Sequence, residues 1–245
     1  MKVLILAAGY ATRLYPLTRE YPKPLLEVKS KPIINHIIGK LEKIPAVDEI
    51  YVVTNSKFIR VFRGWARSLK SSKKITLVDD LTKSNQDRLG AIGDIDFVIA
   101  RKRIKDDLLV IGGDNLFSGS LNKFLSYSGK RPSKASIGLY RLKRREDARR
   151  YGVVELDASG KVAGFEEKPD KPKSSLVAMC LYFIPACLLK MVREYISSKK
   201  GKTDTTGGYI AWLGRRSDIY GHIFKGSWFD IGDHKYLNAA KKKFV

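Results

Sequence analysis

The chain has 245 residues, of which 44% are hydrophobic and 29% charged, a composition typical of a globular protein and not of a disordered or fibrous one. No apolar run reaches the roughly 18 residues of a membrane-spanning helix, and two cysteines without C-x-x-C spacing exclude a disulfide framework and a cysteine zinc site. The net charge of +22 indicates an anionic partner, but the basic residues are scattered and no nucleic-acid-binding motif accompanies them. We therefore expect a cytoplasmic protein with no membrane association and no specific nucleic acid partner. A substrate that carries several phosphates is compatible with the charge.

The first half of the chain alternates predicted strands with predicted helices. Residues 2–7 form a continuous apolar run that predicts a strand buried on both faces, and further strands are predicted at 49–54, 74–78 and 108–111. Helices are predicted between them at 33–42, 57–69 and 89–100, the first with Pro32 in its opening turn. This alternation predicts an α/β fold: a Rossmann-like mixed, mostly parallel sheet flanked by helices.

The second half has shorter connections. Strands are predicted at 135–142, 152–156, 161–166 and 177–184, with a β-hairpin over the turn at 157–160. Helices are predicted at 186–197, 209–215 and 235–243. Cys180 and Cys187 lie in apolar stretches, so we expect both to be buried. We expect one domain of two lobes, with the change near residue 130.

The strongest chemical signal follows the first predicted strand. The string LAAGYATRL at 6–14 is followed by PLT at 16–18 and PKPLL at 22–26. A tight turn after a parallel strand exposes backbone N–H groups where α/β folds bind anions. Gly9 allows close approach to a phosphate, and Arg13 and Lys23 supply positive charge. Gly9 and Arg13 alone would also fit a plain turn with surface cations; the combined string is more specific.

Two carboxylates further along the chain are candidate metal ligands. Asp114, in GGDN at 112–115, ends an apolar strand and should project toward the same crevice as Gly9. Asp230, in WFDIG at 228–232, precedes the last predicted helix. Either could be only structural, Asp114 as a helix N-cap for example. Together they could hold Mg²⁺, with waters and triphosphate oxygens as the remaining ligands.

These strings resemble the sugar-1-phosphate nucleotidyltransferase family, which includes glucose-1-phosphate thymidylyltransferase and its uridylyl and cytidylyl equivalents. The resemblance covers nearly the whole chain and also rests on KPI at 31–33, YGVV at 151–154 and FEEKP at 165–169. It implies that an NTP, with UTP or dTTP favoured, reacts with a sugar 1-phosphate to form an NDP-sugar and pyrophosphate. It also implies one domain over 1–245, with a nucleotide-binding lobe at 1–130, a sugar-phosphate-binding lobe at 131–245 and no C-terminal β-helix domain.

The loop chemistry and the resemblance together assign roles to individual residues. The expected catalytic residues are Arg13 and Lys23, and the expected Mg²⁺ ligands are Asp114 and Asp230. The expected nucleotide-binding residues are Leu6, Ala8, Gly9, Thr12, Gln86, Gly90 and Asp114. The expected sugar-phosphate-binding residues are Tyr151, Gly152, Glu167 and Lys168, although a surface ion pair would also explain Glu167 and Lys168.

The expected reaction needs charge neutralisation more than proton transfer. A sugar phosphate is mostly dianionic at neutral pH, so its oxygen can attack the α-phosphorus without a general base. The three histidines, His36, His222 and His234, form no apparent nucleophile–base arrangement. Catalysis should therefore come from positioning and electrostatic stabilisation.

Three departures from the family pattern leave alternatives open. Ala11 stands where the family loop usually has a second glycine, Cys180 where a glycine often precedes Leu-Tyr-Phe, and residues 203–209 do not match the thymidylyltransferase pattern. The alternatives are a cytidylyltransferase acting on choline phosphate or a polyol phosphate, a catalytically silent nucleotide-binding regulatory subunit, and a nucleic-acid-binding protein. Self-association into a homo-oligomer is compatible with the sequence.

Overall fold

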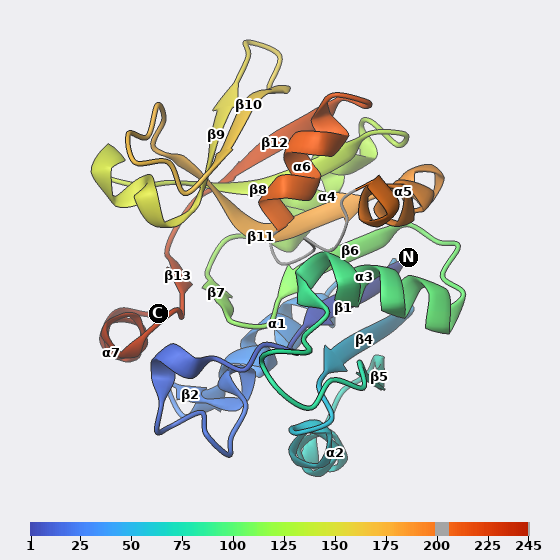
Figure 1. The fold of residues 1–245 in the computed structure, drawn as a ribbon, viewed down its shortest axis with the longest axis vertical. Helices are drawn as coiled ribbons and strands as arrows, with labels where there is room; N and C mark the ends of the chain where they lie inside the picture. The colour runs from blue at the N-terminus through green and yellow to red at the C-terminus, as the bar shows by residue number, and fades with distance from the viewer. Residues whose placement is uncertain (199–205, 245) are drawn as a thin grey trace.

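The computed structural model describes residues 1–198 and 206–244, which form an α/β fold around a nine-stranded mixed sheet (Figure 1). Four parallel strands make one half of the sheet, in the spatial order β5 (Lys74–Asp79), β4 (Glu49–Thr54), β1 (Lys2–Leu6) and β6 (Leu108–Gly112). Along β1, Leu4 joins the apolar cluster on one face of the sheet, whereas Val3 and Ile5 join the cluster on the other. The continuous apolar run thus serves two faces, and the predicted fold class is confirmed.

Antiparallel pairing dominates the other half of the sheet. Strand β11 (Leu176–Ile184) lies beside β6 and also pairs with β8 (Ala135–Arg141) and β9 (Gly152–Leu156). Strand β12 (Ile219–Phe224) runs parallel to β8. The predicted hairpin is confirmed, because β9 pairs with β10 (Val162–Glu167) and Asp157 Oδ1 accepts hydrogen bonds across the turn. Two small sheets pair β2 (Glu27–Val28) with β3 (Lys31–Pro32) and β7 (Asn115–Phe117) with β13 (Trp228–Asp230).

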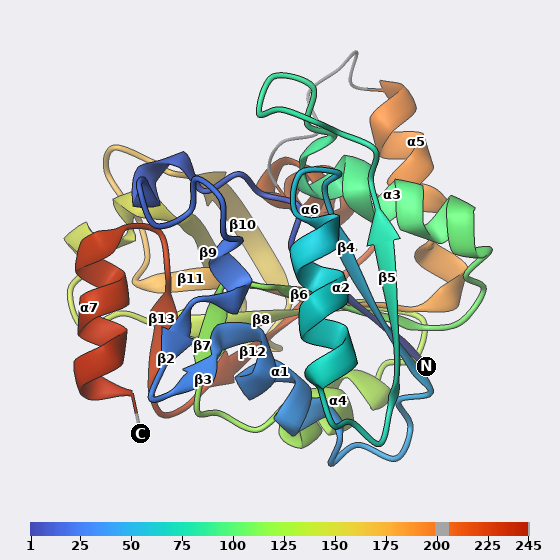
Figure 2. The same ribbon diagram turned by 90° about the horizontal axis from the view of Figure 1, so that it is seen from below.

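Helices cover both faces of the large sheet (Figures 1 and 2). One face packs against α1 (Ile33–Leu41), α2 (Ile59–Ser68) and α4 (Leu121–Gly129). The opposite face packs against α3 (Gly90–Lys102), α5 (Lys190–Ser198) and α6 (Thr206–Gly214). The last helix, α7 (His234–Lys243), lies against β2 and β13. In the described part of the chain, no helix has the length and apolar character to cross a membrane.

The predicted helices and strands are all present with small shifts at their ends, but the sequence reading missed α4, β12 and the short strands β2, β3 and β7. Helix α4 begins after Ser120, whose side chain accepts a hydrogen bond from the backbone N–H of Lys123. Strand β12 contains Gly221, and a Cβ added there would lie 2.6 Å from Leu139 and 2.7 Å from Leu156. A glycine inside a strand weakens its sequence pattern, but close packing requires it here.

Two further expectations need correction or limits. The helix expected from residue 186 begins as a 3₁₀ turn, Ala186–Leu188, before α5. Cys187 lies on this turn and is exposed, so the expectation that it is buried was wrong. Of the segment 203–209, residues 203–205 lie outside the described part of the chain.

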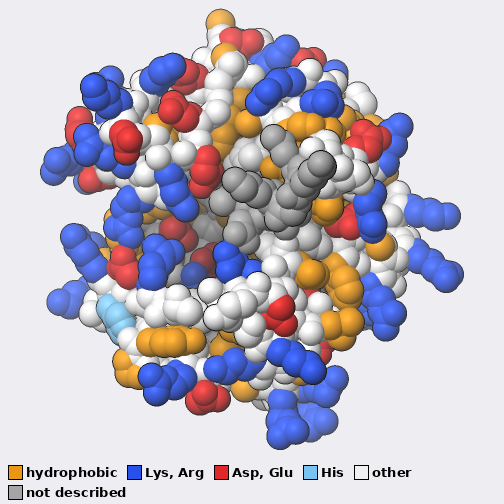
Figure 3. Space-filling view, viewed as in Figure 1, with side chains coloured by type: hydrophobic (Ala, Val, Ile, Leu, Met, Phe, Trp, Pro, Cys, Tyr) orange, Lys and Arg blue, Asp and Glu red, His pale blue; other side chains and the backbone are white. Residues whose placement is uncertain are grey.

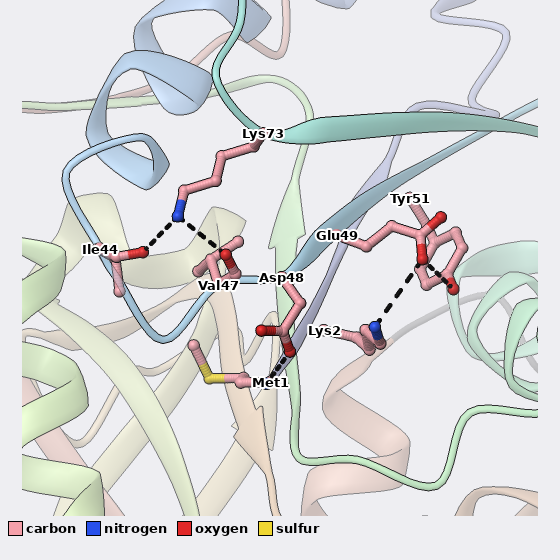
Figure 4. A network of polar contacts seen from close by, with 8 residues as sticks. All are labelled: Met1, Lys2, Ile44, Val47, Asp48, Glu49, Tyr51 and Lys73. Atoms are coloured by element: carbon pink, nitrogen blue, oxygen red, sulfur yellow. Dashed lines mark hydrogen bonds and ion pairs between the residues drawn. The ribbon is translucent and has the colours of Figure 1, made fainter.

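A polar network fixes the amino ends of the parallel strands (Figure 4). The N-terminal ammonium of Met1 lies 2.6 Å from Asp48 Oδ2, just before β4. Lys73 Nζ, just before β5, donates hydrogen bonds to the carbonyls of Ile44 and Val47. These contacts hold the amino ends of the parallel strands in place. The carboxyl ends of the same strands, where α/β folds bind ligands, lie at the opposite end of the sheet.

Candidate active site

The candidate site lies where the connections from the parallel strands diverge. Strand β1 has β4 on one side and β6 on the other, so the crevice beyond its carboxyl end is a topological switch point. The backbone N–H of Gly113 donates a 2.8 Å hydrogen bond to Leu6 O at this end. A Cβ added to Gly113 would lie 2.7 Å from the same oxygen, so a side chain here would push the strands apart. This close approach brings Asp114 to the end of β1, as the sequence predicted.

Two cations from the loop after β1 lie near the two candidate carboxylates. Lys23 Nζ, at the start of the 3₁₀ turn Lys23–Leu25, is 2.5 Å from Asp114 Oδ2. A Cβ added to Gly232 would lie within 3.9 Å of both the Arg13 guanidinium and Asp230 Oδ2, so these two side chains lie near each other. The positive charges of Lys23 and Arg13 both lower the pKa of Asp230. The structure therefore brings all four predicted charged residues together.

Buried apolar contacts hold the Arg13 turn in place. Leu14, the next residue, is fully buried in a cluster with Ile231 and Leu237, which lies on α7. Before the turn, Ala11 adopts a left-handed conformation with φ of 48°. The loop thus follows a path that favours glycine at this position, although the residue is alanine.

Asp230 is fixed relative to Asp114 by the pairing of β13 with β7. Asp230 is in register with Asn115, the residue after Asp114. Asn115 donates a hydrogen bond to the carbonyl of Met179 and accepts one from Trp228 Nε1 at 2.7 Å. Burial and the negative charge of Asp114 raise the pKa of Asp230 to about 6, although the nearby cations lower it. The two carboxylates are therefore close enough to repel each other, and a cation between them would relieve this repulsion.

This carboxylate pair fits Mg²⁺ better than a metal that needs a protein cage. Among residues 1–198 and 206–244, no cluster of three or more His, Cys, Asp or Glu side chains could hold a metal ion. Mg²⁺ often binds one or two carboxylates together with waters and substrate phosphates, so two ligands suffice. The contact of the Lys23 ammonium with Asp114 shows that this position accommodates a cation.

A cavity of about 290 Å³ adjoins the carboxyl end of β1. Four of the predicted nucleotide-binding residues line it: Leu6, Ala8, Gly9 and Gly90. A Cβ added to Gly9 would meet no described atom within 4 Å, so this side of the turn is open to a ligand. Thr12 and Gln86 are exposed and are not among the lining residues, so their roles stay predictions.

The sequence reading missed Asp80 and Asp94, which also line this cavity. Its remaining lining residues are Tyr10, Asp80, Asn85, Arg88, Ala91 and Asp94. Asp94 lies on α3 among the buried residues Ile92, Ile95 and Val98. A carboxylate among the apolar residues of a helix was the signal that could have identified it.

The predicted sugar-phosphate residues also lie together. The side chain of Glu167, at the end of β10, packs against Gly152 and Gly207: added Cβ atoms there would lie 3.3 Å and 2.1 Å from its Oε2. Lys168 N donates a hydrogen bond to Tyr151 O, and Lys168 Nζ lies 3.7 Å from Glu167 Oε1. The Lys168 side chain is 59% exposed, so its ammonium is accessible to a ligand.

Tyr151 connects this group to the carboxylate pair. Its ring packs on the ring of Trp228, with the two ring centroids 5.2 Å apart, and Trp228 lies two residues before Asp230. Burial raises the pKa of Tyr151, and the negative charge of Asp230 raises it further. Sequence reasoning missed Tyr182. Its hydroxyl shares a 2.6 Å hydrogen bond with the hydroxyl of Thr206, and the negative charge of Glu167 helps to raise its pKa. Residues from both halves of the sheet thus face one region.

The excess positive charge does not gather at one place on the visible face. Figure 3 shows Lys and Arg side chains spread over most of that face and interspersed with Asp and Glu. This distribution agrees with the scattered basic residues of the sequence, and the absence of a specific nucleic acid partner stays a prediction.

Comparison with known proteins agrees with this geometry. The nucleotidyl transferase family model matches residues 2–244. The bifunctional protein GlmU of Methanocaldococcus jannaschii is 30% identical over 232 residues, which cover 95% of this chain and 51% of that protein, so the chain spans about half the length of this relative. Glucose-1-phosphate thymidylyltransferase of Neisseria meningitidis is 30% identical, with 98% of this chain and 81% of that protein covered.

Solved structures share the fold over nearly the whole chain. A Bacillus anthracis structure assigned as a glucose-1-phosphate thymidylyltransferase, in complex with sucrose, is 26% identical with a TM-score of 0.80, covering 99% of this chain and 94% of that one. A UDP-glucose pyrophosphorylase complexed with UDP-glucose is 20% identical with a TM-score of 0.81, covering 99% and 97%. The second likeness concerns the fold alone.

Proposed function

The chain belongs to the nucleotidyl transferase family, and from that premise we propose that it joins a nucleoside triphosphate to a sugar 1-phosphate and releases pyrophosphate. We favour UTP and dTTP as the nucleotides, and the similarity to a glucose-1-phosphate thymidylyltransferase supports dTTP. The nucleotide occupies the lobe of residues 1–130 and the sugar phosphate that of residues 131–245.

The convergence of Arg13, Lys23, Asp114 and Asp230 at the carboxyl ends of β1 and β6 carries this proposal. Two anionic reactants must be brought together, and the α-phosphorus must accept an oxygen while pyrophosphate leaves. Arg13 and Lys23 neutralise the triphosphate and stabilise the charge that develops on the leaving group. Such electrostatic preorganisation is the main contribution a protein makes to transfers at phosphorus.

The acceptor is held by the second group of residues. Lys168 Nζ is exposed beside Glu167, so the ammonium can bind the sugar phosphate while the carboxylate accepts a hydrogen bond from a sugar hydroxyl. The Glu167 side chain packs closely against Gly152, and this packing restricts the position of its carboxylate. The attacking oxygen is already ionised at neutral pH, so these residues orient it and remove no proton.

Asp114 and Asp230 would hold Mg²⁺, which neutralises charge on the phosphates of the bound triphosphate. This assignment explains why two like charges lie together although Asp114 raises the pKa of Asp230. When the triphosphate binds, Lys23 can leave Asp114 and bind a phosphate oxygen instead, because its side chain is long and flexible.

A panel of triphosphates against a panel of phosphorylated acceptors, scored by pyrophosphate release, tests the proposal. We expect release with at least one sugar 1-phosphate, in the presence of Mg²⁺ and not with a chelator. Arg13→Ala should abolish most of it, while Arg101→Ala, on the distant last turn of α3, should not. Release only with choline phosphate or a polyol phosphate, or no release by the folded protein with any pair, would refute the proposal.

A further inference from the structure

The first residues of α7 contact both of the groups to which the proposed function assigns substrates. Asp233, the N-cap of α7, accepts a 2.9 Å hydrogen bond from Nη2 of Arg150, and Arg150 is the residue before Tyr151. The next residue, His234, has its Nε2 atom 3.0 Å from the carbonyl oxygen of Tyr15, in the loop after β1. Figure 2 shows the start of α7 next to this loop and to the turn that precedes β9. Two adjacent residues of α7 thus contact the acceptor side and the triphosphate side of the site.

The Arg150 side chain has a fixed position although it is 42% exposed. Its guanidinium carbon lies 4.4 Å from the ring centroid of Tyr236, which is a favourable cation–π contact. Asp233 Oδ2 pairs with the guanidinium while Oδ1 accepts a 3.1 Å hydrogen bond from the backbone N–H of Tyr236, so one carboxylate both caps α7 and binds Arg150. Burial raises the pKa of Asp230, and the positive charge of Arg150 is among the charges that lower it. The guanidinium therefore lies close to the candidate metal site.

The stability of the fold does not explain this arrangement. Exposed ion pairs contribute little to folding, and α7 is already anchored by Leu237, which is buried in one cluster with Leu14 from the loop after β1. The contact between Arg150 and Asp233 adds a fixed position for the backbone that leads into Tyr151. In a transfer between two bound anions, a misplacement of about 1 Å can lower the rate roughly 100-fold. A contact that contributes little to stability can therefore contribute much to the reaction.

We propose that Arg150 is a positioning residue, which through Asp233 and the start of α7 aligns the acceptor residues with the cations that bind the triphosphate. Asp233 connects α7 to the acceptor side and His234 connects it to the loop after β1, so α7 sets the separation of the two bound substrates. Arg150 itself binds neither substrate. The inference rests on the proposed function, because that function assigns the two substrates to the groups that are aligned.

Steady-state kinetics and calorimetric titration with the triphosphate alone test the role of Arg150. Arg150→Ala should lower kcat about 10- to 100-fold, while the KM of the sugar 1-phosphate and the Kd of the triphosphate should change less than about threefold. Asp233→Asn keeps a side-chain acceptor for the N-terminus of α7 but removes the charge, so it should cause a similar loss. The double variant should lose no more than either single one, because the two residues act as a unit.

Two further variants separate positioning from charge alone. Arg150→Lys keeps the charge without the planar fork, so it should recover only part of the lost kcat. Arg149→Ala removes an exposed cation from the same turn and is the matched control, which should behave as wild type. The midpoint of urea denaturation should stay nearly unchanged in Arg150→Ala, because an exposed ion pair contributes little to stability.

Amide hydrogen exchange in the free protein measures the coupling without turnover. The backbone N–H of Lys168 donates to the carbonyl of Tyr151, and that of Tyr15 donates to the carbonyl of Thr12. Arg150→Ala should speed exchange of both N–H groups by about threefold or more, one on each side of the site, and Arg149→Ala should change neither.

Three results would overturn the inference: a raised acceptor KM with unchanged kcat, which would make Arg150 a substrate ligand; unchanged exchange at Tyr15; or a loss of stability large enough to explain the lost activity. Pyrophosphate release by the wild-type protein with an unchanged kcat in Arg150→Ala would leave the proposed function and remove the inference. No release by the wild-type protein with any pair would refute the proposed function, and the exchange measurement would still decide whether α7 couples the two groups.

Discussion

Replacing Asp94 by asparagine should stabilise the protein at neutral pH and change the pH dependence of its stability. In the folded protein the pKa of Asp94 is raised to about 8, whereas an aspartate in an unfolded chain ionises near 3.9. Between these pH values unfolding releases a proton, so the free energy of unfolding falls by up to about 1.4 kcal/mol for each unit that the pH rises. Asparagine does not titrate, so the variant lacks this loss.

The expected size follows from the same figures. Over about three pH units, from 4 to 7, the ceiling is roughly 4 kcal/mol, and relaxation around the neighbouring Asp80 carboxyl should reduce it to about 2 kcal/mol. The difference between variant and wild type should therefore be near zero at about pH 4 and grow steadily toward pH 7.

Urea denaturation at several pH values measures this difference, with unchanged m-values as the check that both proteins unfold alike. Asp96→Asn serves as the control, because its ion pair with Arg193 lies outside the cavity. A difference between Asp94→Asn and wild type that does not vary with pH would show that Asp94 is ionised in the folded protein, and the reasoning from its raised pKa would be refuted.

Four further outcomes are expected. Asp114→Asn and Asp230→Asn should each lower turnover at least ~100-fold, and full activity of either variant with a chelator present would contradict the metal assignment. In calorimetry and steady-state kinetics, Lys168→Ala should raise the KM of the acceptor and leave triphosphate binding nearly intact, whereas Arg13→Ala should mainly lower kcat; the reverse pattern would contradict the two-lobe assignment. Gly113→Ala should destabilise the fold by about 1–3 kcal/mol in urea denaturation, because the new Cβ would lie 2.7 Å from the last carbonyl of β1, and an unchanged midpoint would contradict this. DNA or RNA binding, measured by fluorescence anisotropy against salt, should be weak and sequence-indifferent and should weaken steeply; tight, sequence-selective binding at physiological salt would contradict this.

Much of the fold could be predicted because local sequence patterns specify its helices and strands. The apolar run of β1 identified a strand buried on both faces, and the turn at 157–160 identified the β9–β10 hairpin. The missed elements have local causes. Gly221 interrupts the pattern of β12, and the polar residues Ser126 and Ser128 interrupt the pattern of α4. A short element with a weak period is defined by what packs against it, and that information lies elsewhere in the chain.

The candidate site likewise has parts that the sequence predicted and parts that only the tertiary structure decided. The sequence by itself determined the loop after β1 and its cations, because a strand, a turn and two basic residues follow one another within one short stretch. It also placed Asp114 at a strand end. The tertiary structure alone decided that Asp230 lies next to Asp114, since this depends on the pairing of β13 with β7 across more than a hundred residues.

The two carboxyls of Asp80 and Asp94 show the limit of the sequence most clearly. Asp80 follows β5 and Asp94 lies on α3, and neither position had a recognisable motif around it. Their proximity arises because α3 packs against the face of the sheet near β1, so that two carboxyls from separate elements share one cavity. Periodicity in a sequence specifies which face of an element is buried. Which charged groups then meet, and whether one must keep its proton, depends on how the elements pack and on the water that this packing excludes.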